Sequence, residues 1–157
     1  MNTKDYNRTL FELSPIGLAL FTMDGTVIDC NGAYAGITGR TREETIGLTY
    51  WELTPNVYDE MAKEIMATLT RTGSFQHYEK HYSHRDGHLV YTENQFSNIR
   101  DANGLVTGFM SIGRDITTRK QTELEIAQAE AFSKVMTAHL HPDGRWLKAA
   151  PRLGTML

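Results

Sequence analysis

The stretch IGLALFTMDGTVIDC, residues 16–30, decides the fold class. Two apolar runs, residues 16–23 and 26–30, flank the pair Asp24-Gly25, and this pair accepts the positive φ angles that a tight turn between antiparallel strands requires. We therefore predict a β-hairpin near the start of the chain.

Helical signals follow the hairpin. Asn31 is placed to cap a short helix, and Thr41 begins a second capping pattern with a glutamate three residues later. Residues 50–53 predict a further helical turn. Apolar residues at a spacing of four predict a longer amphipathic helix over residues 57–72, which Gly73 ends.

Three segments of alternating character then predict strands at residues 75–84, 88–99 and 105–115. The connections between them, residues 85–87 and 101–104, both end in glycine and have the composition of hairpin turns, so the three strands should form an antiparallel meander. Together with the first hairpin they predict an α+β fold, a five-stranded antiparallel sheet with short helices packed on one face.

A polar helix is predicted after the last strand, because the chain has no glycine or proline from Arg114 to Leu140. Leu124 lies on a partly apolar seam at heptad spacing. A helix this polar gains little stability alone, so we expect a partner helix and a homodimer.

The end of the chain repeats its beginning, since PDGRWLK at residues 142–148 is similar to MDGTVID at residues 23–29. We predict three parts: a domain over residues 1–115 with an N-terminal cap at about 1–14, a connector helix over 116–137, and the truncated start of a second copy over 138–157.

Composition and motifs limit the class of protein. A net charge of −3 over 157 residues lacks the broad positive field of a nucleic-acid binder, and the longest apolar run, residues 16–23, is far shorter than the roughly 20 residues that cross a membrane. The sequence has one cysteine, Cys30, and contains no glycine-rich nucleotide loop, HExxH or GxSxG motif. We expect a cytoplasmic, non-catalytic segment with no nucleic-acid partner and no membrane segment.

An ordered set of short motifs extends from about Arg8 to Lys120. Its members are Ser14-Pro-Ile-Gly17, Asp24-Gly25, Asn31 with Tyr34, Thr38-Gly-Arg-Thr-Arg-Glu-Glu44, Ile46-Gly47, Gly73, Tyr78-Glu-Lys80, Arg85-Asp-Gly87 and Asp115-Ile-Thr117 with Arg119-Lys120. In this order and spacing the set resembles the PAS sensory family. The resemblance implies the PAS fold with a C-terminal signalling helix, in a bacterial protein whose output is of the histidine kinase or diguanylate cyclase type.

The register of the resemblance, with strict alternation along the strands, gives a set of inward-facing side chains. The candidate pocket residues are Tyr34, Trp51, Tyr78, Lys80, Tyr82, Thr92, Asn94, Phe96, Phe109 and Ser111. Two interpretations remain open: a filled aromatic core, or a small polar and aromatic cavity for an organic ligand in which Lys80 attracts a carboxylate.

The resemblance also bears on cofactors, which stay unknown. The helical segment 31–72 contains no histidine of the kind that ligates haem in relatives, and Tyr50 stands where photoactive relatives carry a reactive cysteine. Positions that hold flavin-binding amides in those relatives are Tyr82, Thr92 and Gly113 here. We therefore expect neither haem of that type nor a thiol-adduct flavin.

Four histidines, His77, His81, His84 and His88, cluster around the predicted turn at residues 85–87. We interpret them as solvated side chains on the sheet edge and predict no metal.

Asp115 lies where the last strand becomes the helix, and it is our candidate for signal relay together with Thr117. The resemblance implies a contact from Asp115 to the sheet, for which Arg85 is the candidate partner; the alternative is a plain helix cap. We therefore expect a sensory module that passes a ligand or conformational input through the helix to a downstream output domain. The alternative is a ligand-free protein–protein interaction and dimerisation domain.

Overall fold

The computed structural model describes residues 2–137, the side chain of Gln76 excepted. Its elements follow the predicted order. They are α1 (Thr3–Leu13), β1 (Gly17–Thr22), β2 (Val27–Cys30), α2 (Gly32–Thr38), α3 (Arg42–Thr45), α4 (Tyr50–Leu53), the 3-10 turn η1 (Asn56–Tyr58), α5 (Asp59–Thr72), β3 (Ser74–Ser83), β4 (Leu89–Arg100), β5 (Val106–Asp115) and α6 (Thr117–Thr137).

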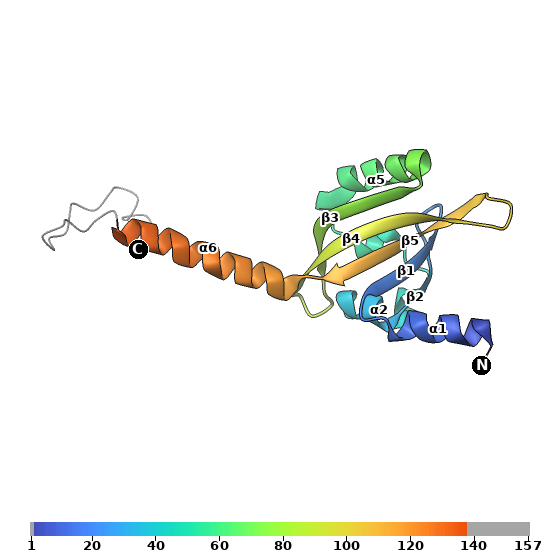
Figure 1. Cartoon of the computed structure of the whole chain (residues 1–157), viewed down its shortest axis with the longest axis horizontal. Helices are drawn as coiled ribbons and strands as arrows, with labels where there is room; N and C mark the ends of the chain where they lie inside the picture. Colours follow the sequence, from blue (N-terminus) through green and yellow to red (C-terminus); the bar gives the residue numbers. More distant parts are fainter. Residues whose placement is uncertain (1, 138–157) are drawn as a thin grey trace, which may run out of the picture. The chain divides into compact units, whose positions relative to one another are not determined.

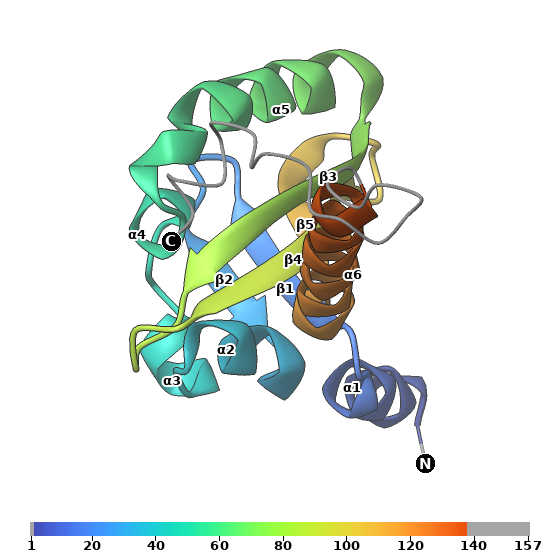
Figure 2. The same ribbon diagram turned by 90° about the vertical axis from the view of Figure 1, so that its left-hand side faces the viewer.

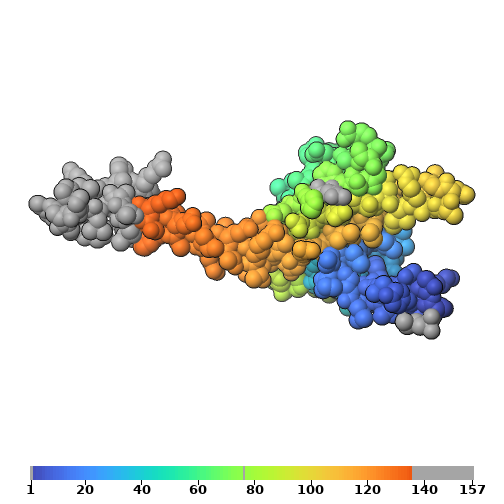
Figure 3. All heavy atoms as spheres, viewed as in Figure 1, coloured from blue at the N-terminus to red at the C-terminus, as the bar shows by residue number. Residues whose placement is uncertain are grey.

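The strands of the described residues form one five-stranded sheet in the order β2-β1-β5-β4-β3, and every neighbouring pair is antiparallel. Helices α2 to α5 lie over one face of it (Figures 1 and 2). The predicted meander is confirmed as β3-β4-β5, and the predicted sheet with helices on one face is confirmed as well. The β4–β5 hairpin, yellow near residue 100, projects past the helices that cover the sheet (Figure 3).

The chain divides into two compact units, one ending at Thr117 and one beginning at Thr118. In the second unit, α6 exposes apolar side chains that include Leu124, Ile126 and Phe132. The repeat expected at residues 138–157 lies outside the described residues. Among the described helices, none combines the length and the apolar character that crossing a membrane requires.

Local capping fixes the short helices. Asn31 caps α2, whose C-terminal Gly39 adopts a left-handed φ of 70°, and Thr41 caps α3 through the expected capping box. A second capping box, Thr49 with Glu52, starts α4. The amphipathic helix predicted over residues 57–72 begins two residues late, because η1 intervenes before α5.

The carboxamide of Asn31 connects three segments of the backbone. Its Oδ1 accepts hydrogen bonds from the backbone N–H groups of Leu18 (2.9 Å) and Tyr34 (3.0 Å). Its Nδ2 donates to the carbonyl oxygens of Phe11 (3.0 Å) and Ile16 (2.9 Å). The side chain is completely buried, so water cannot replace these bonds. Asn31 therefore joins the end of α1, the start of β1 and the first turn of α2.

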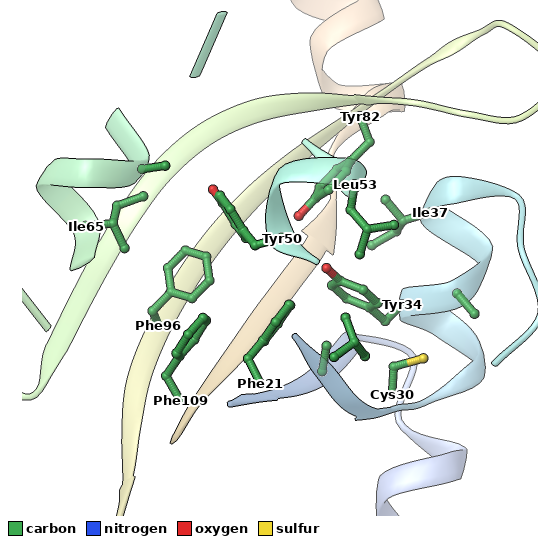
Figure 4. Packing of buried hydrophobic residues seen from close by; sticks show 14 of the residues in the cluster. Phe21, Cys30, Tyr34, Ile37, Tyr50, Leu53, Ile65, Tyr82, Phe96 and Phe109 are labelled. Carbon is green, nitrogen blue, oxygen red and sulfur yellow. The ribbon is translucent and has the colours of Figure 1, made fainter. Parts of the chain in front are cut away.

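Aromatic rings fill the space between the sheet and the helices (Figure 4). Phe21 and Phe109 stack with ring centroids 4.8 Å apart, and Tyr50 meets the edges of Phe21 and Phe96 at 6.3 and 6.1 Å. These contacts join the central strands to α4 through one continuous core.

Replacing Asn31 by Ala should lower the free energy of unfolding by about 3 kcal/mol, because two buried N–H groups and two carbonyl oxygens lose their partner. The matched variant Thr41→Ala removes an exposed cap and should cost only about 1 kcal/mol. Urea unfolding measures both values. Equal losses would contradict the connecting role of Asn31.

Candidate functional site

The structure buries nine of the ten candidate pocket residues on the helix-covered face of the sheet. The exposed fraction is at most 8% for each of Tyr34, Tyr78, Lys80, Tyr82, Thr92, Asn94, Phe96, Phe109 and Ser111. They come from α2 and from β3, β4 and β5. Their role in binding a ligand stays a prediction.

Trp51 is the exception, because it is not buried. Its side chain is 43% exposed, whereas Tyr50 and Leu53 of the same helical turn are buried. A spacing of three residues puts Tyr50 and Leu53 on one face of α4 and turns Trp51 away. The signal for this phase was present in the sequence as the capping box of Thr49 and Glu52.

Lys80 lies in the interior, 2% exposed, and is held by uncharged groups. Its Nζ donates to Thr54 Oγ1 (2.8 Å) and to the Tyr50 hydroxyl (3.2 Å). The same nitrogen lies over the rings of Tyr50 and Tyr82, at 4.4 and 4.1 Å from their centroids. Because burial disfavours the ammonium form, the pKa of Lys80 is lowered well below its usual value.

The interior tyrosines surround Lys80 with polar tips. The hydroxyls of Tyr50 and Tyr78 are 3.1 Å apart, and burial raises the pKa of both, so they stay protonated. The hydroxyls of Tyr34 and Tyr82 point toward each other (Figure 4). Burial raises the pKa of these two tyrosines as well.

Several buried polar atoms have no hydrogen-bond partner among the described residues. Besides the Oδ1 of Asn98, they are the hydroxyls of Tyr34, Tyr82 and Ser111 and the Oδ1 of Asn94. Each such group costs about 1–3 kcal/mol relative to its hydrated state. We name the three hydroxyls and the Asn94 Oδ1, together with Lys80, the polar interior.

A separate cavity of about 130 Å³ is lined by residues of α4, α5, the β1–β2 turn and the sheet, and no group of the polar interior is part of its wall. Its lining residues are Met23, Asp24, Gly25, Tyr50, Trp51, Ala62, Ile65, Met66, Phe96 and Phe109. Tyr50 connects the two places, because its ring lines the cavity and its hydroxyl accepts from Lys80. Trp51, although 43% exposed, is part of the cavity wall on the α4 side.

The relay residues lie at the end of β5. Asp115 accepts a hydrogen bond from the backbone N–H of Thr117 (2.8 Å), and Thr117 Oγ1 accepts one from the N–H of Tyr91 on β4 (3.0 Å). The N–H of Ile116 donates to the carbonyl of Tyr91 (2.8 Å). Strand β4 is therefore bonded to the segment that leads out of the sheet.

Arg85 takes another position than the expected one. Its guanidinium pairs with Glu44 of α3 (3.0 Å), and its N–H donates to the carbonyl of Thr38 at the end of α2 (3.1 Å). The expected Arg85–Asp115 pair is wrong, because Asp115 faces Thr92 in the sheet register while Arg85 lies in the turn between β3 and β4, where it pairs with Glu44.

The histidines are not simply solvated. His81 Nδ1 lies 2.8 Å from the hydroxyl of Tyr58. His84 and His88 come together with Asp86 in the β3–β4 turn. The interpretation as solvated side chains agrees with the exposed His77 and His88, whereas His81 and His84 are partly buried.

Lys80→Met should remove a pH dependence of stability. Since the folded-state pKa of Lys80 is lowered, the unfolded chain binds more protons below the usual lysine pKa of 10.5. Wild-type stability should therefore rise from pH 7 toward pH 10, by up to about 1.4 kcal/mol per pH unit from this group. The variant should lack this slope and should exceed the wild type most at pH 7.

Urea unfolding at pH 7, 8 and 9 measures the difference. Lys63→Met, at an exposed lysine of α5, is the matched control and should keep the wild-type slope. Parallel profiles for Lys80→Met and the wild type would contradict a buried neutral amine.

Comparison with known proteins agrees with the observed five-stranded sheet and its covering helices. A family model described as the PAS fold matches residues 11–121. A solved PAS domain of a Colwellia psychrerythraea protein superposes with a TM-score of 0.68 at 23% identity, covering 74% of this chain and 99% of that one. The PAS fold implied by the sequence motifs is thereby confirmed.

Two curated relatives are signalling proteins of Escherichia coli strain K12. The probable diguanylate cyclase DgcE is 29% identical over 117 residues, which are 74% of this chain and 11% of the relative. The signal transduction histidine-protein kinase AtoS is 28% identical over 131 residues, which are 83% of this chain and 21% of the relative. The chain thus spans a small part of either relative. The family model matches residues 11–121 and the sheet has the expected topology. The chain therefore belongs to the PAS family, whose sensory domains occur in signalling proteins.

Proposed function

We propose that this PAS domain is a cytoplasmic sensory module that binds a small organic ligand between the sheet and helices α4 and α5. One observation carries the proposal: an aromatic cavity is lined by Tyr50, and the hydroxyl of Tyr50 accepts a hydrogen bond from the buried Lys80. Ligand pockets characteristically combine apolar walls with a few convergent polar groups.

The chemistry of the lining favours a mainly apolar ligand with one acceptor group. The rings of Tyr50, Phe96 and Phe109 and the side chain of Trp51 supply apolar and aromatic surface. Lys80 donates protons to hydrogen bonds in either charge state, so a ligand carbonyl or carboxylate that displaces Tyr50 would find a donor there. A carboxylate would also restore the positive charge on Lys80.

The relay in this proposal runs along β4. Ligand contacts with Phe96 of β4 would shift that strand, and the bonds from Tyr91 to Ile116 and Thr117 transmit the shift to the start of α6. Asp115 supports the same segment through its bond to the Thr117 N–H.

The output in this proposal lies in a longer protein. The two curated relatives are a probable cyclase and a histidine kinase, of which this chain spans 11% and 21%. We propose that the segment itself carries out no reaction and controls a domain of such a type, as a homodimer joined through α6. The connector over residues 116–137 and the second repeat over 138–157 belong to this proposal.

The second candidate function is a ligand-free interaction domain. The close stacking of Phe21 on Phe109, at 4.8 Å between centroids, and the small volume of the cavity favour it. The two functions differ in whether a small molecule occupies the interior.

Filling the cavity should abolish ligand binding. Ala62 is buried in the cavity wall on α5, and Ala62→Phe should occupy the space that a ligand needs. Ala67→Phe on the exposed side of the same helix is the matched control. Native mass spectrometry and thermal shifts with a metabolite library should detect a ligand for the wild type and Ala67→Phe but not for Ala62→Phe.

The ligand-free function makes the opposite prediction. If wild-type protein purified from cells carries no small molecule, and no metabolite in the library stabilises it, the sensory proposal is wrong. The ligand-free interaction domain then takes its place.

Dimerisation through α6 should depend on Leu124, whose side chain is 56% exposed in the single chain. Light scattering should give about twice the monomer mass for the wild type and a reduced mass for Leu124→Arg, because the charge would be buried in the seam. Ala129→Arg, off the seam, should leave the mass unchanged. A monomeric wild type at high concentration would contradict the dimer.

A further inference from the structure

The turn between β3 and β4 carries three metal-ligating side chains at alternate positions, in the sequence His84-Arg-Asp-Gly-His88. The turn is tight: the N–H of His84 donates to the carbonyl of His88, and the N–H of Gly87 donates to that of His84, both at 2.9 Å. Gly87 has a φ of 95°, a conformation that favours glycine. This backbone brings the side chains of residues 84, 86 and 88 to one side of the turn.

The donor atoms converge on one point. His84 Nδ1 lies 2.9 Å from Asp86 Oδ1, and His88 Nδ1 is in even closer contact with the same oxygen. The two imidazole rings stack with centroids 4.3 Å apart, and one ligand atom from each of the three residues lies within 4.8 Å of the others.

We propose that His84, Asp86 and His88 form a binding site for a divalent transition metal of the zinc class. Two imidazoles and one carboxylate suit such an ion, whereas calcium and magnesium prefer oxygen ligands throughout. Donors around a tetrahedral zinc ion, with bonds of about 2.0–2.1 Å, lie about 3.3 Å apart. To reach this geometry the Asp86 oxygen must move away from both imidazoles, and the stacked rings must rotate so that their nitrogens face the ion. The fourth position is left for water.

Helix α2 holds one side of this site in place. His84 packs against Gly39, where a Cβ atom would overlap the imidazole ring. The neighbouring Arg85 bonds to Thr38 and Glu44, as described above. The position of His84 is therefore determined by its contact with the end of α2 and not by the turn alone.

The site is independent of the proposed ligand pocket. Its three ligands lie in the turn, whereas the cavity is lined from α4, α5 and the sheet face. A failed ligand search would leave the metal proposal standing, and the reverse also holds.

Titration of the chelator-treated chain with Zn²⁺ by calorimetry, and with Co²⁺ by visible absorption, tests the site. His139 and His141 lie outside the described residues, so both are changed to Ala in every protein compared. We expect one ion per chain, an affinity weakened by about 10-fold or more in His84→Ala and in His88→Ala, and an unchanged affinity in the exposed control His77→Ala.

Asp86→Asn provides the variant that preserves the shape of the turn, because its amide oxygen can still accept from the N–H of His88. Zn²⁺ should raise the melting temperature of the parent protein and raise that of Asp86→Asn much less. Saturable binding that is equal in the His84, His88 and His77 variants would overturn the proposal, and so would the lack of saturable binding at millimolar Zn²⁺.

Discussion

The carboxamide of Asn31 is the interaction on which the rest of the domain depends. It satisfies two N–H groups and two carbonyl oxygens in a place that water does not reach. Its Oδ1 accepts hydrogen bonds and its Nδ2 donates them. A carboxylate or an apolar side chain of similar size at this position would therefore leave buried backbone groups unpaired. The bond to Tyr34 orients the first turn of α2, and Tyr34 is the ring through which that helix reaches the polar interior. The side chain of Asn31 therefore contributes to the stability of the fold and also positions Tyr34 in the polar interior.

The polar interior works against stability. A domain optimised for stability alone would fill the position of Lys80 with an apolar side chain and would give Ser111 and Asn94 hydrogen-bond partners. The tight aromatic packing around Phe21 and Phe109 supplies the stabilisation that allows such groups to persist. Sites that act on ligands commonly carry this local cost, which is why the arrangement supports the sensory proposal over a purely structural one.

Local chemistry made most of the fold predictable, and tertiary packing limited the rest. Asp24-Gly25 predicted the hairpin, because turn geometry acts over a few residues. The inward set from Tyr78 to Ser111 followed from the register that the PAS resemblance implies, together with the period of two along a strand. The exposure of Trp51 was harder to predict, because α4 is a single turn whose phase is signalled by its capping box and by no repeated apolar pattern. The partner of Arg85 depends on how the β3–β4 turn meets α2 and α3, which no pattern within the turn encodes.

The place of β5 between β1 and β4 has a consequence for how the chain folds during synthesis. The sheet pairs Gly17 with Gly113, so its first and last strands meet in the middle. Neither the hairpin of β1 and β2 nor the later strands can bury the core face until β5 has left the ribosome. Completion of the domain and the start of α6 therefore follow each other within a few residues of chain. An emerging chain would keep its aromatic residues exposed until then, which makes this the interval of greatest risk of aggregation.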